Sequence, residues 1–266
     1  MRIPFTQVDA FADAVFGGNP AAVMPLVQWL PDATLQAIAA ENNLSETAFI
    51  VSTQGDGDAD FELRWFTPTN EVVMCGHATL ASGHVVLSSD RDRERVRFRT
   101  RQAGVLEVAR QGAGYALALP VWAAEPRPLP DLVAALGLEH AVETLWHPHR
   151  YALVVVDDAA IVTLLAPDFR RLAADGDVLT IVSAPGEATD IVSRCFVPGG
   201  GIDEDPVTGS AHAVLTPYWA KRLGRNEFTA FQASRRGGRL TCRLDEDRVV
   251  LGGGCVTVIE GSFLLP

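Results

Sequence analysis

The sequence has no excess of basic residues and no long apolar run. Its 22 Lys and Arg residues stand against 33 Asp and Glu residues, which gives a net charge of −11 at pH 7. Such a chain lacks the basic face that nucleic acids and anionic membranes require. The longest apolar runs also fall short of the ~18 residues that a membrane-spanning helix needs. We therefore expect neither nucleic acid nor membrane among the partners.

Cysteine is scarce as well. The four cysteines, Cys75, Cys195, Cys242 and Cys255, lie far apart and form no CxxC pair. This spacing predicts free thiols in a reducing compartment. The chain starts MRIPFTQVDAFAD, with polar residues where a signal peptide needs an unbroken apolar stretch. We expect a cytoplasmic protein.

What is present is enough apolar material for a packed core, with 48% hydrophobic residues in 266. At ~100–200 residues per domain, this length predicts one large domain or two small ones. Five segments alternate in polarity or are rich in β-branched and aromatic residues, which is typical of half-buried strands. They read FTQVDAF, AFIVS, DFELRWF, RVRFRT and GVLEVAR. Residues 31–43 predict an amphipathic helix that begins at a proline.

Two further segments, 75–89 and 208–224, predict helices without a polar face. Such helices are buried, and their small side chains suit close wrapping by a sheet. We expect Pro217 to kink or break the second helix. The two segments resemble each other, with CGHATLASG against VTGSAHAVL, and a Pro-rich stretch at 120–130 predicts a linker between them. The sequence thus indicates two similar halves, each a curved sheet around one central helix.

Glu46 is the first candidate for chemistry, because it opens an apolar strand among the polar residues of ENNLSETAFI. A carboxylate in that place suits general acid/base catalysis, although a solvated carboxylate in a turn fits the same pattern. His77 follows in the first turn of the 75–89 helix. It could hydrogen-bond a substrate or be a core histidine, and the helix dipole there disfavours a cation. Free N–H groups at this helix start could bind an anion.

The third candidate segment is GGGIDEDPVTGSAH at 199–212. One acidic residue would serve as a helix cap, but three in a row exceed what a cap needs. Gly209 and Ser210 offer N–H and hydroxyl donors at the start of the second apolar helix. His147 and His149 form the one close histidine pair, without a metal-binding motif, and we expect a surface pair and no metal.

Five segments occur in the order found in the PhzF-like family of phenazine-biosynthesis proteins, which the chain resembles from Phe5 to about Gly261. They are FTQVDAFADAVFGGNPAAV, ENNLSETAFI, LRWFTPTNEVVMCGHATLA, DEDPVTGSAHAVLTPYWAKRLG and FQASRRGG. The resemblance implies an α+β fold of two pseudo-symmetric lobes, each a barrel-like and mostly antiparallel sheet around a central helix, as in the diaminopimelate epimerases. It places the boundaries at 1–117, completed by a strand at about 256–266, and at 118–255. It also implies a homodimer with the active site in the cleft between the lobes.

The same resemblance implies a cofactor-free isomerase that acts on a small carboxylic acid, as the family does on trans-2,3-dihydro-3-hydroxyanthranilate. The family's catalytic residues match Glu46, His77 and Asp205. The substrate-binding positions match four residues at the two helix starts. These are Gly76, Ala78, Gly209 and Ser210.

One departure from the epimerases bears on the mechanism. Those enzymes use two cysteines, whereas this chain has Cys75 at the first position and Pro206 at the second. Racemisation by two thiols is therefore excluded, and we expect Cys75 to be a buried space-filling residue. Glu46 would instead carry one proton between two carbons. Two alternatives stay open: an epimerase that uses no thiol, and a binding protein without catalytic activity on the same fold.

Overall fold

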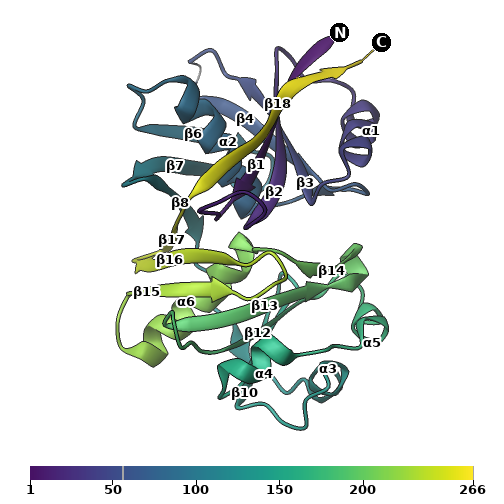
Figure 1. Cartoon of the computed structure of the whole chain (residues 1–266), viewed down its shortest axis with the longest axis vertical. Helices are drawn as coiled ribbons and strands as arrows, with labels where there is room; N and C mark the ends of the chain where they lie inside the picture. The colour runs from purple at the N-terminus through teal and green to yellow at the C-terminus, as the bar shows by residue number, and fades with distance from the viewer. Residues whose placement is uncertain (56, 266) are drawn as a thin grey trace. The chain divides into compact units, whose positions relative to one another are not determined.

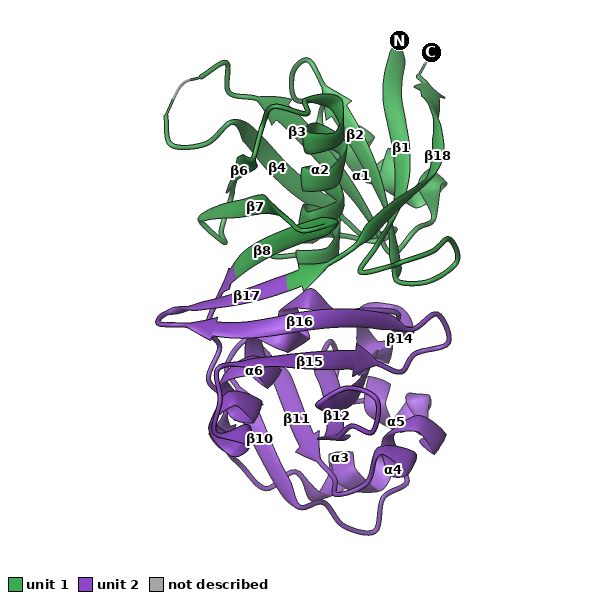
Figure 2. Ribbon diagram, turned by 60° about the vertical axis from the view of Figure 1, so that its left-hand side comes forward, with its two compact units in different colours: residues 1–118, 252–266 green, residues 119–251 purple. Residues whose placement is uncertain are grey.

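The structure is a computed structural model that describes residues 1–55 and 57–265. Figure 1 draws the whole chain. It divides into two compact units, which are coloured in Figure 2. Unit 1 comprises Met1–Ala118 and Gly252–Pro266, of which Pro266 lies outside the described residues; unit 2 comprises Leu119–Leu251. The C-terminal segment thus returns to the unit in which the chain begins.

Unit 1 is mainly a sheet. Its strands are β1 (Arg2–Ala10), β2 (Asn19–Leu26), β3 (Glu46–Ser52), β4 (Phe61–Phe66), β5 (Glu71–Val72), β6 (Arg95–Thr100), β7 (Val105–Gln111), most of β8 (Gly114–Pro120) and β18 (Cys255–Leu264). The order is β18–β1–β2–β3–β4–β6–β7–β8, with β5 paired to β4. All described pairs are antiparallel except β2 with β3 and β4 with β6, which are parallel.

Helix α2 (Gly76–Ser89) fills the interior of unit 1. It contacts strands from both halves of the sheet, including β1, β2, β6 and β7 (Figure 1). At Gly83, a Cβ atom would lie 2.4 Å from Cγ1 of Val108, so this close approach of helix and strand requires glycine. The hydroxyls of Thr79 and Ser82 donate to carbonyls one turn back, which satisfies these buried polar groups.

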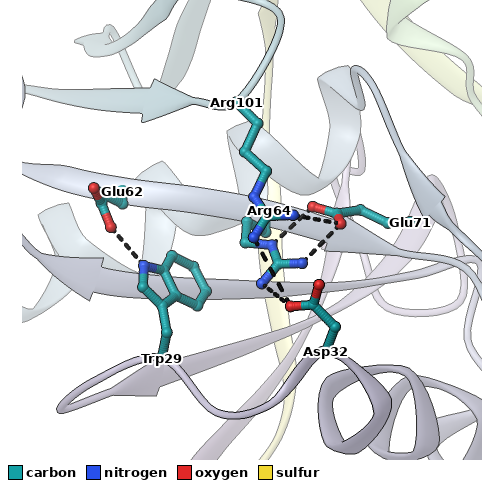
Figure 3. A network of polar contacts seen from close by, with 6 residues as sticks. All are labelled: Trp29, Asp32, Glu62, Arg64, Glu71 and Arg101. Carbon is teal, nitrogen blue, oxygen red and sulfur yellow. Dashed lines mark hydrogen bonds and ion pairs between the residues drawn. The ribbon is translucent and has the colours of Figure 1, made fainter.

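The outer face of β4 carries a buried arginine that ties helix α1 (Asp32–Asn42) to the sheet (Figure 3). Arg64 is 4% exposed and donates from two nitrogens to Glu71, at 2.8 and 2.7 Å. A third nitrogen donates to Asp32, the first residue of α1, at 2.9 Å. The guanidinium also lies over the ring of Trp29. Arg64 lowers the pKa of the Asp32 carboxyl through this hydrogen bond and its charge.

Unit 2 repeats the plan of unit 1. Its strands are β9 (Glu125–Pro126), β10 (Glu143–His147), β11 (Tyr151–Val155), β12 (Leu179–Pro185), β13 (Ile191–Val197), β14 (Ile202–Asp205), β15 (Glu227–Gln232), β16 (Gly238–Asp245) and most of β17 (Arg248–Gly253). Its helices are α3 (Pro130–Ala135), α4 (Ala159–Leu164), α5 (Phe169–Ala173), α6 (Gly209–Leu223) and the 3-10 turn η1 (Pro198–Gly200).

The pairing pattern of strands β10 to β16 is the same as that of β1 to β7. In unit 2, β11 with β12 and β13 with β15 are the parallel pairs, and the other pairs in this stretch are antiparallel. Helix α6 takes the place of α2, between β14 and β15. The predicted α+β class with two similar halves is therefore confirmed. The helices expected at 31–43, 75–89 and 208–224 are α1, α2 and α6, and the five expected strands are β1, β3, β4, β6 and β7.

The structure bears on two proline-containing segments: α6 is not broken at Pro217, and residues 120–130 lie within unit 2. Helix α6 continues through Pro217, which cannot donate to the carbonyl of Ala213 one turn back. That carbonyl instead accepts the backbone N–H of Trp122 at 3.1 Å, so the missing bond is replaced and the helix is not broken. The same bond, with that from the Val121 N–H to Asp247, makes the expected linker at 120–130 an ordered part of unit 2.

No helix among residues 1–55 and 57–265 combines the length and the hydrophobicity of a membrane span.

Candidate active-site groups

Glu46 and His77 meet in unit 1, where β3 begins and α2 makes its first turn. Oε2 of Glu46 lies 3.0 Å from Nε2 of His77, and the two side chains are 14% and 4% exposed. The two atoms are at ion-pair distance, although they are not aligned as a hydrogen bond. The carboxylate thus keeps a small opening to its surroundings while the imidazole is enclosed.

The opposite nitrogen of the His77 ring faces a residue that the sequence did not suggest. Nδ1 lies 3.1 Å from the amide nitrogen of Asn19, a fully buried side chain at the start of β2, and 3.5 Å from Sγ of Cys75. With the Asn19 amide nitrogen turned to the ring, Nδ1 accepts and the proton of a neutral ring sits on Nε2, toward Glu46. In the protonated ring both nitrogens donate, so Nδ1 then needs the oxygen of a turned Asn19 amide. Asn19, Glu46, Cys75 and His77 are called the Glu46 group below.

Burial and the contacts within the Glu46 group together shift the pKa values of His77 and Cys75. Burial by itself lowers the pKa of His77, but the interactions of the ring with Cys75 and Glu46 outweigh it and hold that pKa well above the usual value. Burial raises the pKa of the Cys75 thiol to about 11, and Glu46 adds to the rise. The thiol is therefore neutral near pH 7, and Glu46 is the negative partner of His77. The nearby carboxylate overrides the helix dipole that we expected to disfavour a cation here.

The Glu46 group combines a carboxylate, a thiol and an imidazole, which are the side chains of metal sites. One ligand atom of each residue lies within 4.8 Å of the others. The imidazole, however, stands between the other two with Nδ1 toward the thiol and Nε2 toward the carboxylate. One ion binds one ring nitrogen, so this arrangement suits a proton relay better than a chelate. His147 and His149 instead pack around the ring of Trp122.

Unit 2 holds the second set of predicted residues, at the step from β14 into α6. Asp205 ends β14 and is 8% exposed. Its Oδ2 accepts a hydrogen bond from the hydroxyl of Thr208, the residue that precedes α6. Gly209 and Ser210 are the first two residues of that helix, as Gly76 and His77 are of α2. Thr208, and not Asp205, is the N-cap residue of α6.

The neighbours of Asp205 have different roles. Glu204 makes a two-point ion pair with Arg194 of β13, at 2.7 and 3.0 Å. Asp203 is exposed. The pairing of β14 with β13 shifts register between Ile202 and Glu204, so Asp203 lies at an irregularity and does not face the interior with Asp205. Each of the three acidic residues thus has its own role. Glu204 forms a structural ion pair, Asp203 is exposed, and Asp205 is the candidate site residue.

Gln232 is the second residue that the sequence did not suggest. It ends β15, is fully buried, and makes three hydrogen bonds with the 205–208 turn. It lies in the segment FQASRRGG, which contributed to the resemblance without a role of its own. A buried amide at the end of a strand was the available signal.

Comparison with known proteins now decides the family. The profile of the phenazine biosynthesis-like proteins, PhzC-PhzF, matches residues 8–261. The chain belongs to this family. It is 48% identical, over the full length of both chains, to "Uncharacterized isomerase PA2770" of Pseudomonas aeruginosa. The crystal structure of a PhzF family protein from Enterococcus faecalis is 44% identical and superposes with a TM-score of 0.90, with both chains fully covered.

More distant structures share only the fold with this chain. A hydroxyproline epimerase from Agrobacterium vitis superposes with a TM-score of 0.62 at 11% identity, over 98% of this chain and 92% of that one. The predicted relation to epimerase-like folds is thereby confirmed. Membership of a family whose close relatives carry the name isomerase makes this PhzF-like chain an isomerase.

Proposed function

We propose that this PhzF-like protein moves a proton between two carbons of a small carboxylic acid without a cofactor, and that Glu46 is its acid/base. The observation that carries the proposal is the 3.0 Å contact between the Glu46 carboxylate and Nε2 of His77. A general base must be positioned and partly shielded from water while one face stays open to substrate. Glu46 meets these demands with 14% of its side chain exposed.

The reaction balances without an oxidant or a second substrate. Glu46 removes a proton from a carbon next to a π-system, and the electron pair of the broken C–H bond enters that system. The protonated Glu46 then delivers the proton to another carbon, where a new C–H bond forms and a double bond has moved. His77 orients the carboxylate throughout, and the N–H groups at the start of α2 stabilise the developing charge.

The other predicted residues have binding roles in this proposal. Asp205 accepts a hydrogen bond from an amine or hydroxyl of the substrate. The resemblance to the family assigns substrate binding to Gly76 and Ala78 in unit 1, and to Gly209 and Ser210 in unit 2. Cys75 does no chemistry, because a thiol with a pKa of about 11 is not a base near pH 7.

The test is proton exchange followed by NMR in D₂O, with trans-2,3-dihydro-3-hydroxyanthranilate and a panel of other small unsaturated carboxylic acids as probes. We expect a shifted double bond in at least one probe, with deuterium at the new carbon in the fraction of turnovers in which the protonated Glu46 exchanges with solvent before it delivers the proton. Deuterium at a stereocentre whose double bonds stay in place would instead identify an epimerase. Probes that bind tightly and exchange nothing would identify a binding protein.

A further inference from the structure

The Gln232 side chain is directed at one turn of unit 2. Its Oε1 accepts the backbone N–H of Thr208 at 2.8 Å. Its Nε2 donates to the carbonyl of Asp205 at 2.8 Å and to Oγ1 of Thr208 at 3.1 Å. The side chain is 0% exposed. An apolar residue could fill the same space. The amide of Gln232 does more, because its hydrogen bonds reach both Asp205 and Thr208, the two ends of the 205–208 turn.

These contacts set the direction of each hydrogen bond. A backbone N–H must meet the amide oxygen and a carbonyl must meet the amide nitrogen, so the Gln232 amide has one orientation. Oγ1 of Thr208 receives a hydrogen bond from Gln232 and therefore turns its own proton toward Oδ2 of Asp205. The orientation of the Asp205 carboxylate is thus transmitted from Gln232 through the hydroxyl of Thr208.

We propose that Gln232 is a positioning residue that aims the Asp205 carboxylate at the amine or hydroxyl of the substrate. The inference rests on the proposed function, in which Asp205 binds that group. It adds a specificity determinant: the choice between ligands with and without the donor depends on a residue 27 positions away from the carboxylate that contacts it.

Of the titratable groups around the turn, Glu204 is paired with Arg194, and two buried groups are neutral near pH 7. Cys195 of β13 pairs with Asp205 across the strands, and burial raises the pKa of its thiol. His212 of α6 donates from Nδ1 to the carbonyl of Thr208, and burial lowers its pKa to about 4. A carboxyl group introduced at position 232 would therefore titrate mainly against Asp205.

The experiment compares anthranilate with benzoate, which differ by one amine, as calorimetric probes of the full chain. In Gln232→Glu, the ionised side chain still accepts from Thr208 but no longer donates. We expect the preference for anthranilate to fall about tenfold, the value of roughly one hydrogen bond to a charged group. Lowering the pH should restore part of the preference, because the protonated carboxyl donates again. Gln232→Leu, of similar volume, should lose the preference at every pH.

Gln36→Glu is the matched control, since the Gln36 amide also donates to a backbone carbonyl, that of Thr67 in unit 1. It should leave the preference unchanged. Gln232 variants that melt at a lower temperature yet keep the full preference at all pH values would overturn the inference and leave a structural role. Failure of the proposed function looks different: wild type and Asp205→Asn would then bind the two probes in the same ratio, or Glu46→Gln would keep its turnover.

Discussion

The amide nitrogen of Asn19 lies 3.1 Å from Nδ1 of His77, while Nε2 on the other side of the ring lies 3.0 Å from the Glu46 carboxylate. The ring is thus held from both sides by residues 58 and 31 positions away, on the two parallel neighbours β2 and β3. Asn19 selects which nitrogen carries the proton of a neutral ring. A substitution at Asn19 should therefore alter the protonation of His77 and, through it, the contact with Glu46.

The first prediction concerns this partner. Asn19→Asp places a negative charge beside Nδ1, so the already raised pKa of His77 should rise further. NMR titration of the histidine ring protons measures it directly. Asn70→Asp, at an exposed turn of the same unit, is the control and should leave the titration unchanged. An unaltered His77 titration in Asn19→Asp would show that the contact does not govern the ring.

The second prediction concerns the acid/base. Glu46→Gln keeps the size of the side chain but cannot take up a proton, so turnover of an identified substrate should fall at least ~10²-fold. Circular dichroism and the melting temperature should stay near those of the wild type. Near-normal turnover would remove Glu46 from the mechanism.

The third prediction concerns stability and pH. The pKa of His77 is raised in the folded state, so the stabilisation from its pairing with Glu46 is complete below the unfolded pKa of ~6.5. It is lost as the pH rises through the folded pKa. Unfolding by urea from about pH 6 to about pH 9 should show this decline in the wild type and not in His77→Asn. Identical slopes in the two proteins would contradict the pairing.

The fourth prediction concerns Cys75. With a pKa of about 11 and 5% exposure, its thiol should react slowly with iodoacetamide near pH 7. Cys75→Ala should keep most of the turnover, because the thiol takes no part in proton transfer. Loss of catalysis with an intact fold would restore a thiol mechanism.

The fifth prediction concerns the network on β4. Arg64→Ala removes a buried guanidinium from Asp32 and Glu71, which are 68% and 29% exposed and regain water. We expect a loss of about 2 kcal/mol in the free energy of unfolding, less than for a fully buried pair. Arg97→Ala breaks an exposed pair with Glu107 and should leave the free energy of unfolding almost unchanged. Equal losses in the two variants would show that burial of Arg64 adds nothing.

The elements with a clear periodicity could be predicted from the sequence, as could the candidate residues that stand in recognisable motifs. Asn19 and Gln232 could not, because nothing local shows which distant group a buried amide will meet. That α6 continues through Pro217 could not be predicted for a similar reason. A rule about the interior of an isolated helix does not include a backbone N–H that arrives from residue 122.

The repeated strand order also has a consequence for how this enzyme can change. Glu46 is the first residue of β3, and the matching strand of unit 2, β12, begins with Leu179. The two units share one strand order, but the matching strand begins with an ionisable side chain in unit 1 and with an aliphatic side chain in unit 2. Once the copies are joined in one chain, each accumulates substitutions independently. One can keep its acid while the other varies the residues that choose the ligand.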